Sequence, residues 1–248
     1  MIEVSQLHKS FGQQQVLRGV NMKIDRGESV VIIGGSGCGK SVLLRHIIGL
    51  VQPDEGDVKI DGQSIADLSE RELIKVRRKF GMLFQGSALF DSLTVEENVG
   101  FLLDREQTMS PEAIRETVAD ALELVDLGGT QGKKPAELSG GMKKRVGLAR
   151  AIVYKPEIIL YDEPTTGLDP VVADSIDQLV IRMRDQLKCT TIVVTHDTRS
   201  MRRVGNRVML LHHGEIHANG TPDEIFNSTD PIVHKFVNGI ADPKDLEF

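Results

Sequence analysis

The residues best suited to chemistry lie between positions 34 and 42. An apolar run at 29–33 leads into a glycine-rich loop, and apolar residues at helical spacing follow it at Val42, Leu43, Leu44, Ile47 and Ile48. A loop between a strand and a helix directs backbone N–H groups and the positive end of the helix dipole at one point. We therefore predict a nucleotide phosphate site formed by Gly34, Gly35, Ser36, Gly37, Cys38, Gly39, Lys40, Ser41 and Val42. Lys40 is expected to reach the β- and γ-phosphates, and Ser41 to place its hydroxyl on Mg²⁺.

Two adjacent acidic residues, Asp162 and Glu163, end a second apolar run at 158–161. Successive side chains of a strand point to opposite faces, so the two carboxylates are predicted to have different tasks. Asp162 suits the Mg²⁺ shell, and Glu163 is predicted to polarise the attacking water. Acidic residues are also common in turns, but the phosphate loop earlier in the chain favours the nucleotide interpretation.

The segment 138–142 reads Leu-Ser-Gly-Gly-Met and opens a predicted helix shortly before the acidic strand. Taken alone, Ser-Gly-Gly is more often a simple helix cap. Here it could also provide a second anion-binding helix N-terminus, too far along the fold to serve the same phosphate in the same chain.

The ordered set of these motifs resembles the ATPase subunits of ABC transporters over residues 1 to about 227. The set comprises the phosphate loop, Gln85, 138–142, Asp162-Glu163, the Gly-Leu-Asp at 167–169 and His196. The resemblance implies an ATP- and Mg²⁺-dependent hydrolase that works as a head-to-tail homodimer. Each ATP would lie between the phosphate loop of one subunit and Ser139, Gly140 and Gly141 of the other.

The resemblance also implies roles for single residues outside these motifs. Phe11 would stack on adenine, although a Phe in a short strand is a core residue just as often. Gln85 would contact Mg²⁺ and the attacking water and respond to a membrane partner. Asp169 would cross the dimer interface. His196 would contact the γ-phosphate and hold Glu163. Three later histidines, His212, His213 and His217, are interpreted as hairpin surface.

One departure from the family pattern indicates a particular branch of the family. The residue after Ser-Gly-Gly is commonly Gln, but here it is Met142, followed by Lys143 and Lys144. With the sequences at 41–50 and 83–95, this is similar to the Mla/Mce branch (MlaF type), whose ATPases power phospholipid traffic between bacterial inner and outer membranes. That branch implies a permease dimer and an MCE-domain lipid-binding protein as partners, with or without a small regulatory subunit. It also implies a place at the cytoplasmic face of the inner membrane.

One other function remains open as an alternative, and two further classes are disfavoured. The nearest is the ATPase of an importer for amino acids or another small solute, which would use the same site chemistry. Clamp-like ABC ATPases need a long coiled coil or tandem domains, and 248 residues hold neither. A kinase or GTPase would leave 138–142 and His196 unexplained.

Composition fits a protein that acts on a membrane only through a partner. Thirty basic and thirty-six acidic residues give a net charge of −6, so charge does not favour nucleic acid. The basic run at 75–79 is interpreted as a solvated helix face. Cys38 and Cys189 are not expected to pair, which fits a reducing cytosol. We expect no signal peptide and no membrane helix, because no apolar run approaches the ~20 residues needed.

The strands and helices expected along the sequence must position these residues. Their order predicts an α/β fold with a P-loop NTPase core, an N-terminal antiparallel β-subdomain and an inserted α-helical subdomain at about 86–155. Strands are expected at 2–4, 16–17, 20–24, 29–33, 57–60, 158–161 and 191–194, and a hairpin at 208–217. Capping boxes at Ser69 and Thr94 and a cap at Ser139 predict helix starts. The ATPase domain is expected to span 1–239. The remaining tail, 240–248, could dock on a second subunit through Leu246 and Phe248, or could be a simple chain end.

Overall fold

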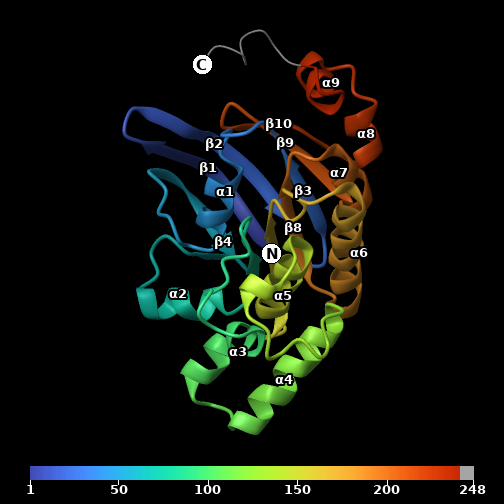
Figure 1. Ribbon diagram of the computed structural model, residues 1–248. Helices are drawn as coiled ribbons and strands as arrows, with labels where there is room; N and C mark the ends of the chain where they lie inside the picture. Colours follow the sequence, from blue (N-terminus) through green and yellow to red (C-terminus); the bar gives the residue numbers. More distant parts are fainter. Residues whose placement is uncertain (241–248) are drawn as a thin grey trace. The chain divides into compact units, whose positions relative to one another are not determined.

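A computed structural model describes residues 1–240 and divides the chain into two compact units. One unit combines Met1–Arg77 with the segment that begins at Ile192, and the other is Arg78–Thr191. Within the first unit, segments far apart in sequence lie side by side, as the blue strand β3 and the orange strand β9 show (Figure 1). The predicted tail lies outside the described residues from position 241 onward.

An antiparallel sheet in the first unit confirms the predicted N-terminal β-subdomain. Its strand order is β2-β1-β4-β5, with β1 (Ile2–Phe11), β2 (Gln14–Ile24), β4 (Glu55–Ile60) and β5 (Gln63–Ser64). Ile2 lies opposite Ile24 on one side and Ile60 on the other. Strand β1 is longer than the predicted 2–4, because it continues through register shifts after Ser5.

Parallel strands in the same unit support the phosphate loop. Strand β3 (Ser29–Ile33) is buried along its whole length and pairs in parallel with β9 (Arg207–His212). Burial on both faces explains the unbroken apolar run, which is typical of a parallel sheet covered by helices. The other elements of the unit are α1 (Lys40–Ile47), α2 (Glu70–Arg77), β8 (Thr190–Thr195, which begins two residues before the unit's second segment), α7 (Thr198–Val204), β10 (Glu215–Gly220), α8 (Pro222–Phe226) and α9 (Pro231–Val237).

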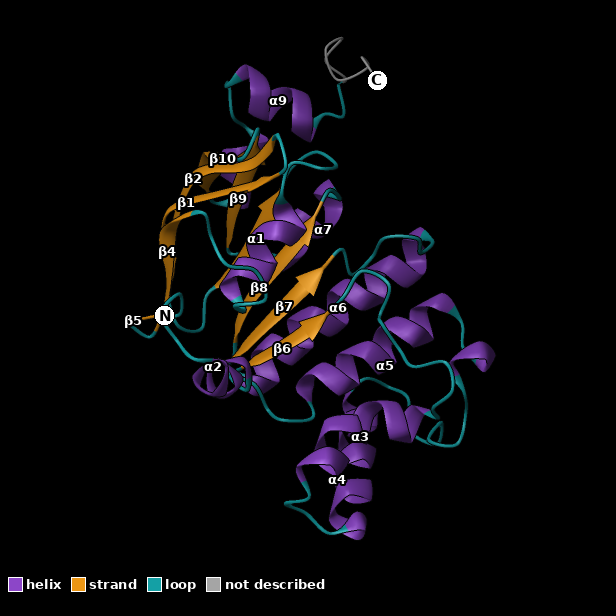
Figure 2. Ribbon diagram, turned by 90° about the vertical axis from the view of Figure 1, so that its left-hand side faces the viewer, coloured by secondary structure: helices purple, strands orange, loops and turns teal. Residues whose placement is uncertain are grey.

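The second unit holds a parallel strand pair and a group of helices. Strand β6 (Phe80–Leu83) pairs with β7 (Ile158–Asp162). The helices are α3 (Val95–Glu106), α4 (Pro111–Leu124), the short η1 (Pro135–Glu137), α5 (Gly140–Ile152) and α6 (Pro170–Leu187). Helices α3, α4 and α5 pack against one another (Figure 2).

The predicted helix starts agree with the structure. Thr94 and Glu97 form a complete capping box at α3, and Ser139 accepts the Met142 N–H at the start of α5. These side chains satisfy donors that the first helical turn leaves unpaired. Ser69 lies just before α2, and its hydroxyl and backbone N–H both donate to the Glu72 carboxylate in the first turn of the helix. Among the helices of residues 1–240, none combines the length and apolar character needed to cross a membrane.

Strand β6 and helices α7 and α9 are among the elements that were not predicted from the sequence, as are the short β5 and η1. Strand β6 is only four residues long and contains Gly81, whose lack of a side chain leaves room for the Ala151 carbonyl oxygen. Helices α7 and α9 have seven residues each, too few for a helical stripe to be recognised. Asp197 and Asp230 cap them, and Asp230-Pro231 was a signal that could have predicted the start of α9.

Candidate active site

The phosphate loop joins β3 to α1, as predicted. Gly39 is the N-cap of α1 with a φ of 106°, in the left-handed region that favours glycine, and no side chain caps the helix. A Cβ at Gly39 would lie 2.9 Å from a methyl carbon of Leu17, and one at Gly34 would overlap the carbonyl oxygen of Leu211. The glycines therefore let the loop pass close to β2 and β9 while its backbone wraps the start of the helix.

The Lys40 ammonium lies within the loop. Its Nζ donates to the carbonyl oxygens of Gly34 at 2.8 Å and Gly35 at 2.9 Å, and the side chain is buried. A buried cation beside a helix N-terminus gives two independent reasons for an anion to bind here. This donor set fits a nucleotide polyphosphate.

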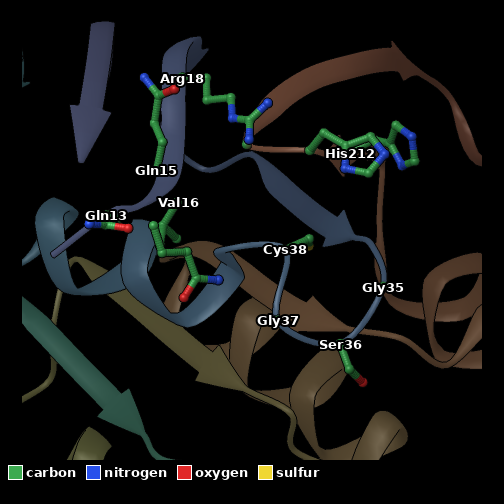
Figure 3. Close-up of a pocket in the computed structure, with 12 residues that line it drawn as sticks. Gln13, Gln15, Val16, Arg18, Gly35, Ser36, Gly37, Cys38 and His212 are labelled. Atoms are coloured by element: carbon green, nitrogen blue, oxygen red, sulfur yellow. The ribbon is translucent and has the colours of Figure 1, made fainter. Parts of the chain in front are cut away.

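A pocket of about 400 Å³ lies against the outer part of this loop (Figure 3). One wall is formed by Gly35, Ser36, Gly37 and Cys38, and the others by Gln13, Gln14, Gln15, Val16, Arg18, His212, His213 and Gly214. His212 and His213 belong to the predicted hairpin, and both also line this pocket beside the phosphate loop. Arg18 and these histidines were missed as pocket residues, because no sequence signal relates positions so far apart.

Two predicted residues of the first unit are exposed. Phe11 ends β1 and is 49% exposed, and the Lys9 Nζ lies 5.6 Å from its ring centroid. Phe11 is not among the residues that line the pocket. His196 directly follows β8 and is exposed, while the next residue, Asp197, caps α7.

The acidic pair in the second unit is buried. Asp162 is the last residue of β7 and 6% exposed, and Glu163 is 7% exposed. Glu163 has a φ of 50°, which is uncommon for a residue with a side chain. Its Oε2 accepts a hydrogen bond of 2.9 Å from the Thr166 hydroxyl.

Lys144 of α5 brings two predicted residues together. Its Nζ donates to the carbonyl oxygen of Gln85 and, at 3.1 Å, to that of Glu163. Burial of the side chain lowers the pKa of Lys144, whereas the nearby carboxylates of Asp162 and Glu163 act to raise it. The Gln85 side chain itself is exposed. Lys144 was not predicted as a site residue.

Ser139 and Asp169 both cap helices within their own chain. Ser139 accepts the Met142 N–H at 3.3 Å, and Asp169 accepts those of Val171 and Val172 at 3.0 Å each. Ser139, Gly140 and Asp169 are nevertheless exposed. Gly141 is buried, and a Cβ there would lie 2.6 Å from a methyl carbon of Val172. The start of α5 thus combines close packing on α6 with an open N-terminus.

The predicted Mg²⁺ ligands are three residues of different types. Among residues 1–240, no group of three His, Cys, Asp or Glu side chains is arranged to hold a metal. The proposed donors are a hydroxyl (Ser41), an amide (Gln85) and a carboxylate (Asp162), all of which supply oxygen. Mg²⁺ prefers oxygen and is commonly bound by one or two carboxylates together with substrate phosphates, so this set fits it.

Comparison with known proteins gives consistent matches along the chain. A family model described as ABC transporter matches residues 17–166. The probable ribonucleotide transport ATP-binding protein mkl of Mycobacterium leprae is 43% identical over 96% of this chain and 69% of its own length. The intermembrane phospholipid transport system ATP-binding protein MlaF of Haemophilus influenzae is 39% identical over 98% of this chain and 92% of its own length.

A solved structure agrees with these matches. It is described as the dimeric post-hydrolysis state of an ATP-binding cassette with ADP and phosphate. It is 37% identical to this chain, with a TM-score of 0.82, over 90% of this chain and 99% of its own.

Proposed function

Since this chain belongs to the ABC transporter family of ATP-binding and ATP-hydrolysing subunits, we propose that it drives phospholipid movement between the inner and outer membranes of a bacterium. The observation that carries the proposal is the near full-length likeness, over both chains, to the phospholipid transport protein of Haemophilus influenzae. Met142, where the family commonly has Gln, points to the same branch. No residue of this chain need contact a lipid, because the permease would form the path.

In the first unit, the phosphate loop would hold ATP. Lys40 would exchange its bonds to the loop carbonyls for the β- and γ-phosphates, and Ser41 would serve as an Mg²⁺ ligand with Asp162 and Gln85. Bound Mg²⁺ would neutralise phosphate charge during hydrolysis. Phe11 would stack on adenine, and Val42 would flank the nucleotide as the residue after Ser41. The exposed ring of Phe11 supports its assignment, since a core residue would be buried.

In the second unit, Glu163 would accept a proton from the attacking water. Its carboxylate is buried and oriented by Thr166, which suits a positioned base. His196, exposed at the end of β8, would contact the γ-phosphate and hold Glu163.

The complete site would need a second copy of the chain. Ser139, Gly140 and Gly141 open α5 without any acidic residue in its first turn, so its N-terminus would favour a phosphate of the partner's ATP. The exposure of Ser139 and Gly140 supports this role, and Asp169 would lie at the same interface. The dimeric cassette among the solved structures supports the homodimer.

We also place the permease contact on the segment 86–97. Phe90 is 44% exposed and packs against Phe101 of α3 with ring centroids 4.6 Å apart and the rings tilted by 36°. A neighbouring pocket of about 370 Å³ is lined by Leu93, Glu96, Glu97, Gly100, Phe101, Asp104, Arg105, Pro111, Ile114 and Arg115. An exposed apolar cluster beside a hollow suits a partner helix. Docking here would hold the subunit at the cytoplasmic face of the inner membrane, with an MCE-domain protein and a small regulatory subunit in the same complex.

The second candidate is the ATPase of an importer for a small solute. The mycobacterial relative, described as a probable ribonucleotide transport protein, favours it. Purification of the tagged chain from detergent-solubilised membranes separates the two. Recovery of a permease with an MCE-domain lipid-binding protein supports phospholipid transport. Recovery of a permease with a solute-binding protein instead overturns it.

A further inference from the structure

Helix α5 carries two cationic side chains that end on backbone carbonyl oxygens of neighbouring loops. Lys144 reaches Gln85 and Glu163, and Arg150 donates to Ser87 at 2.7 Å and Ala88 at 2.8 Å. Between them, Gly147 allows close packing, since a Cβ there would lie 2.8 Å from Leu83 and 3.3 Å from Ser87. One face of α5 therefore contacts the segment that carries Gln85 both before and after that residue.

Three of the residues held in this way have uncommon backbone conformations. Glu163, Ser87 and Ala88 have φ values of 50°, 60° and 47°. Such values are rare outside glycine and persist only where the surroundings stabilise them. Hydrogen bonds from charged donors are stronger than neutral ones, and each of these carbonyl oxygens accepts one from Lys144 or Arg150.

Lys144 is costly to bury. Its side chain is 5% exposed, and burial disfavours the charged ammonium. A well-packed apolar side chain would avoid this desolvation cost. We infer that the buried ammonium is useful because it hydrogen-bonds the backbone of Gln85 and Glu163, the two residues proposed to act on the attacking water.

We propose that Lys144 is a positioning residue for ATP hydrolysis, which fixes the backbone of Glu163 and Gln85 relative to Ser139 at the start of the same helix. The inference rests on the proposed role of Glu163 as the base. Ser139 begins α5 and Lys144 lies just over one turn further along, so any shift of α5 would carry Glu163 and the Gln85 segment with it. Lys144 would thus coordinate the part of the subunit that serves its partner's ATP with the part that serves its own.

The test is the Lys144→Met substitution in the full chain with MgATP. Met keeps the length of the side chain but removes its charge and donors. We expect kcat to fall about 10- to 100-fold, the scale for a misplaced catalytic group, with KM and ATP affinity changed less than about 3-fold. Lys144→Arg, which keeps a cationic donor, should recover most of the rate. Lys143→Met is the matched control, because the Lys143 ammonium makes no hydrogen bond or ion pair within residues 1–240.

A double substitution separates positioning from simple damage to the fold. If Lys144 acts through Glu163, adding Lys144→Met to Glu163→Gln should lower the residual rate less than about 2-fold. The inference is overturned if the double variant loses rate by the product of the two single effects, or if Lys144→Met alone has wild-type kcat. Either result leaves Glu163 as the proposed base. A near-normal rate for Glu163→Gln alone overturns the proposed function of Glu163 instead. Thermal melting of each variant shows whether it is folded.

Discussion

The hydroxyl of Thr166 donates a hydrogen bond of 2.9 Å to Oε2 of Glu163. Thr166 follows Glu163 by three positions, so the bond orients the carboxylate from within the same turn of chain. Lys144 holds the backbone of Glu163 from another element. The buried Glu163 is thereby held through both its side chain and its main chain. An acidic residue that rotates freely on the surface would lack both restraints.

Replacement of Glu163 by Gln should slow ATP hydrolysis at least ~100-fold, the usual scale for loss of a positioned base. The amide cannot accept the proton, while the proposed ligands Lys40, Ser41 and Asp162 would still bind MgATP. The variant should therefore accumulate as an ATP-bound dimer, measurable by phosphate release and size-exclusion chromatography. Glu116→Gln, at an exposed position of α4, is the matched control. Turnover close to wild type would show that another group is the base.

Replacement of Ser139 by Arg should abolish hydrolysis and leave ATP binding by the monomer almost unchanged. Bulk and positive charge at the start of α5 would block closure on the partner's nucleotide. Ser110 caps α4 in the same way, through a 3.3 Å bond from the Ala113 N–H, so Ser110→Arg controls for the loss of a cap. Equilibrium binding of a fluorescent ATP analogue gives the monomer affinity. If Ser139→Arg weakens it, Ser139 acts in its own subunit.

Replacement of Phe90 by Ala should weaken assembly with the permease without unfolding the subunit. Phe90 is partly exposed, while its backbone N–H and carbonyl are both bonded to the buried Asn98 side chain, which the substitution leaves in place. Leu102 on α3 is 54% exposed, and Leu102→Ala is the comparison for loss of an exposed apolar side chain. Pull-down of the permease by each variant provides the measurement. An intact complex with an unchanged ATPase rate would place the contact elsewhere.

Stability should decrease below about pH 6.5 in a manner that depends on His46. Burial in α1 lowers the pKa of His46 below the ordinary value of 6.5, and nearby Lys9 also lowers it, whereas its bond to the Val42 carbonyl and nearby Asp54 raise it. The unfolded chain therefore binds the proton first as pH falls, which favours unfolding. Urea unfolding at pH 7.5 and 5.5 should show a smaller loss for His46→Gln than for wild type. An equal loss of unfolding free energy in both proteins would show that His46 does not contribute to the pH dependence of stability.

Sequence motifs predicted the local parts of the site but not its tertiary contacts. The phosphate loop, the acidic pair and the cap at Ser139 each depend on neighbouring residues, so a short window of sequence contains them. Lys144 bonds to carbonyl oxygens 59 and 19 residues away, and no local pattern reports such pairs. Strand β6 was missed for the same reason, since its pairing with β7 joins Phe80 to Ile158. The individual roles assigned to site residues stay predictions until the substitutions are measured.

The central claim is tested most directly by lipid movement in a reconstituted complex. The chain and its co-purified partners are placed in vesicles that contain a fluorescent phospholipid, and transfer to the lipid-binding partner or to acceptor vesicles is followed on addition of MgATP. Our account predicts that ATP increases the net transfer rate in one direction for wild type and does not do so for Glu163→Gln. ATP hydrolysis by wild type with no ATP-dependent phospholipid transfer, together with ATP-dependent uptake of a small solute, would contradict it.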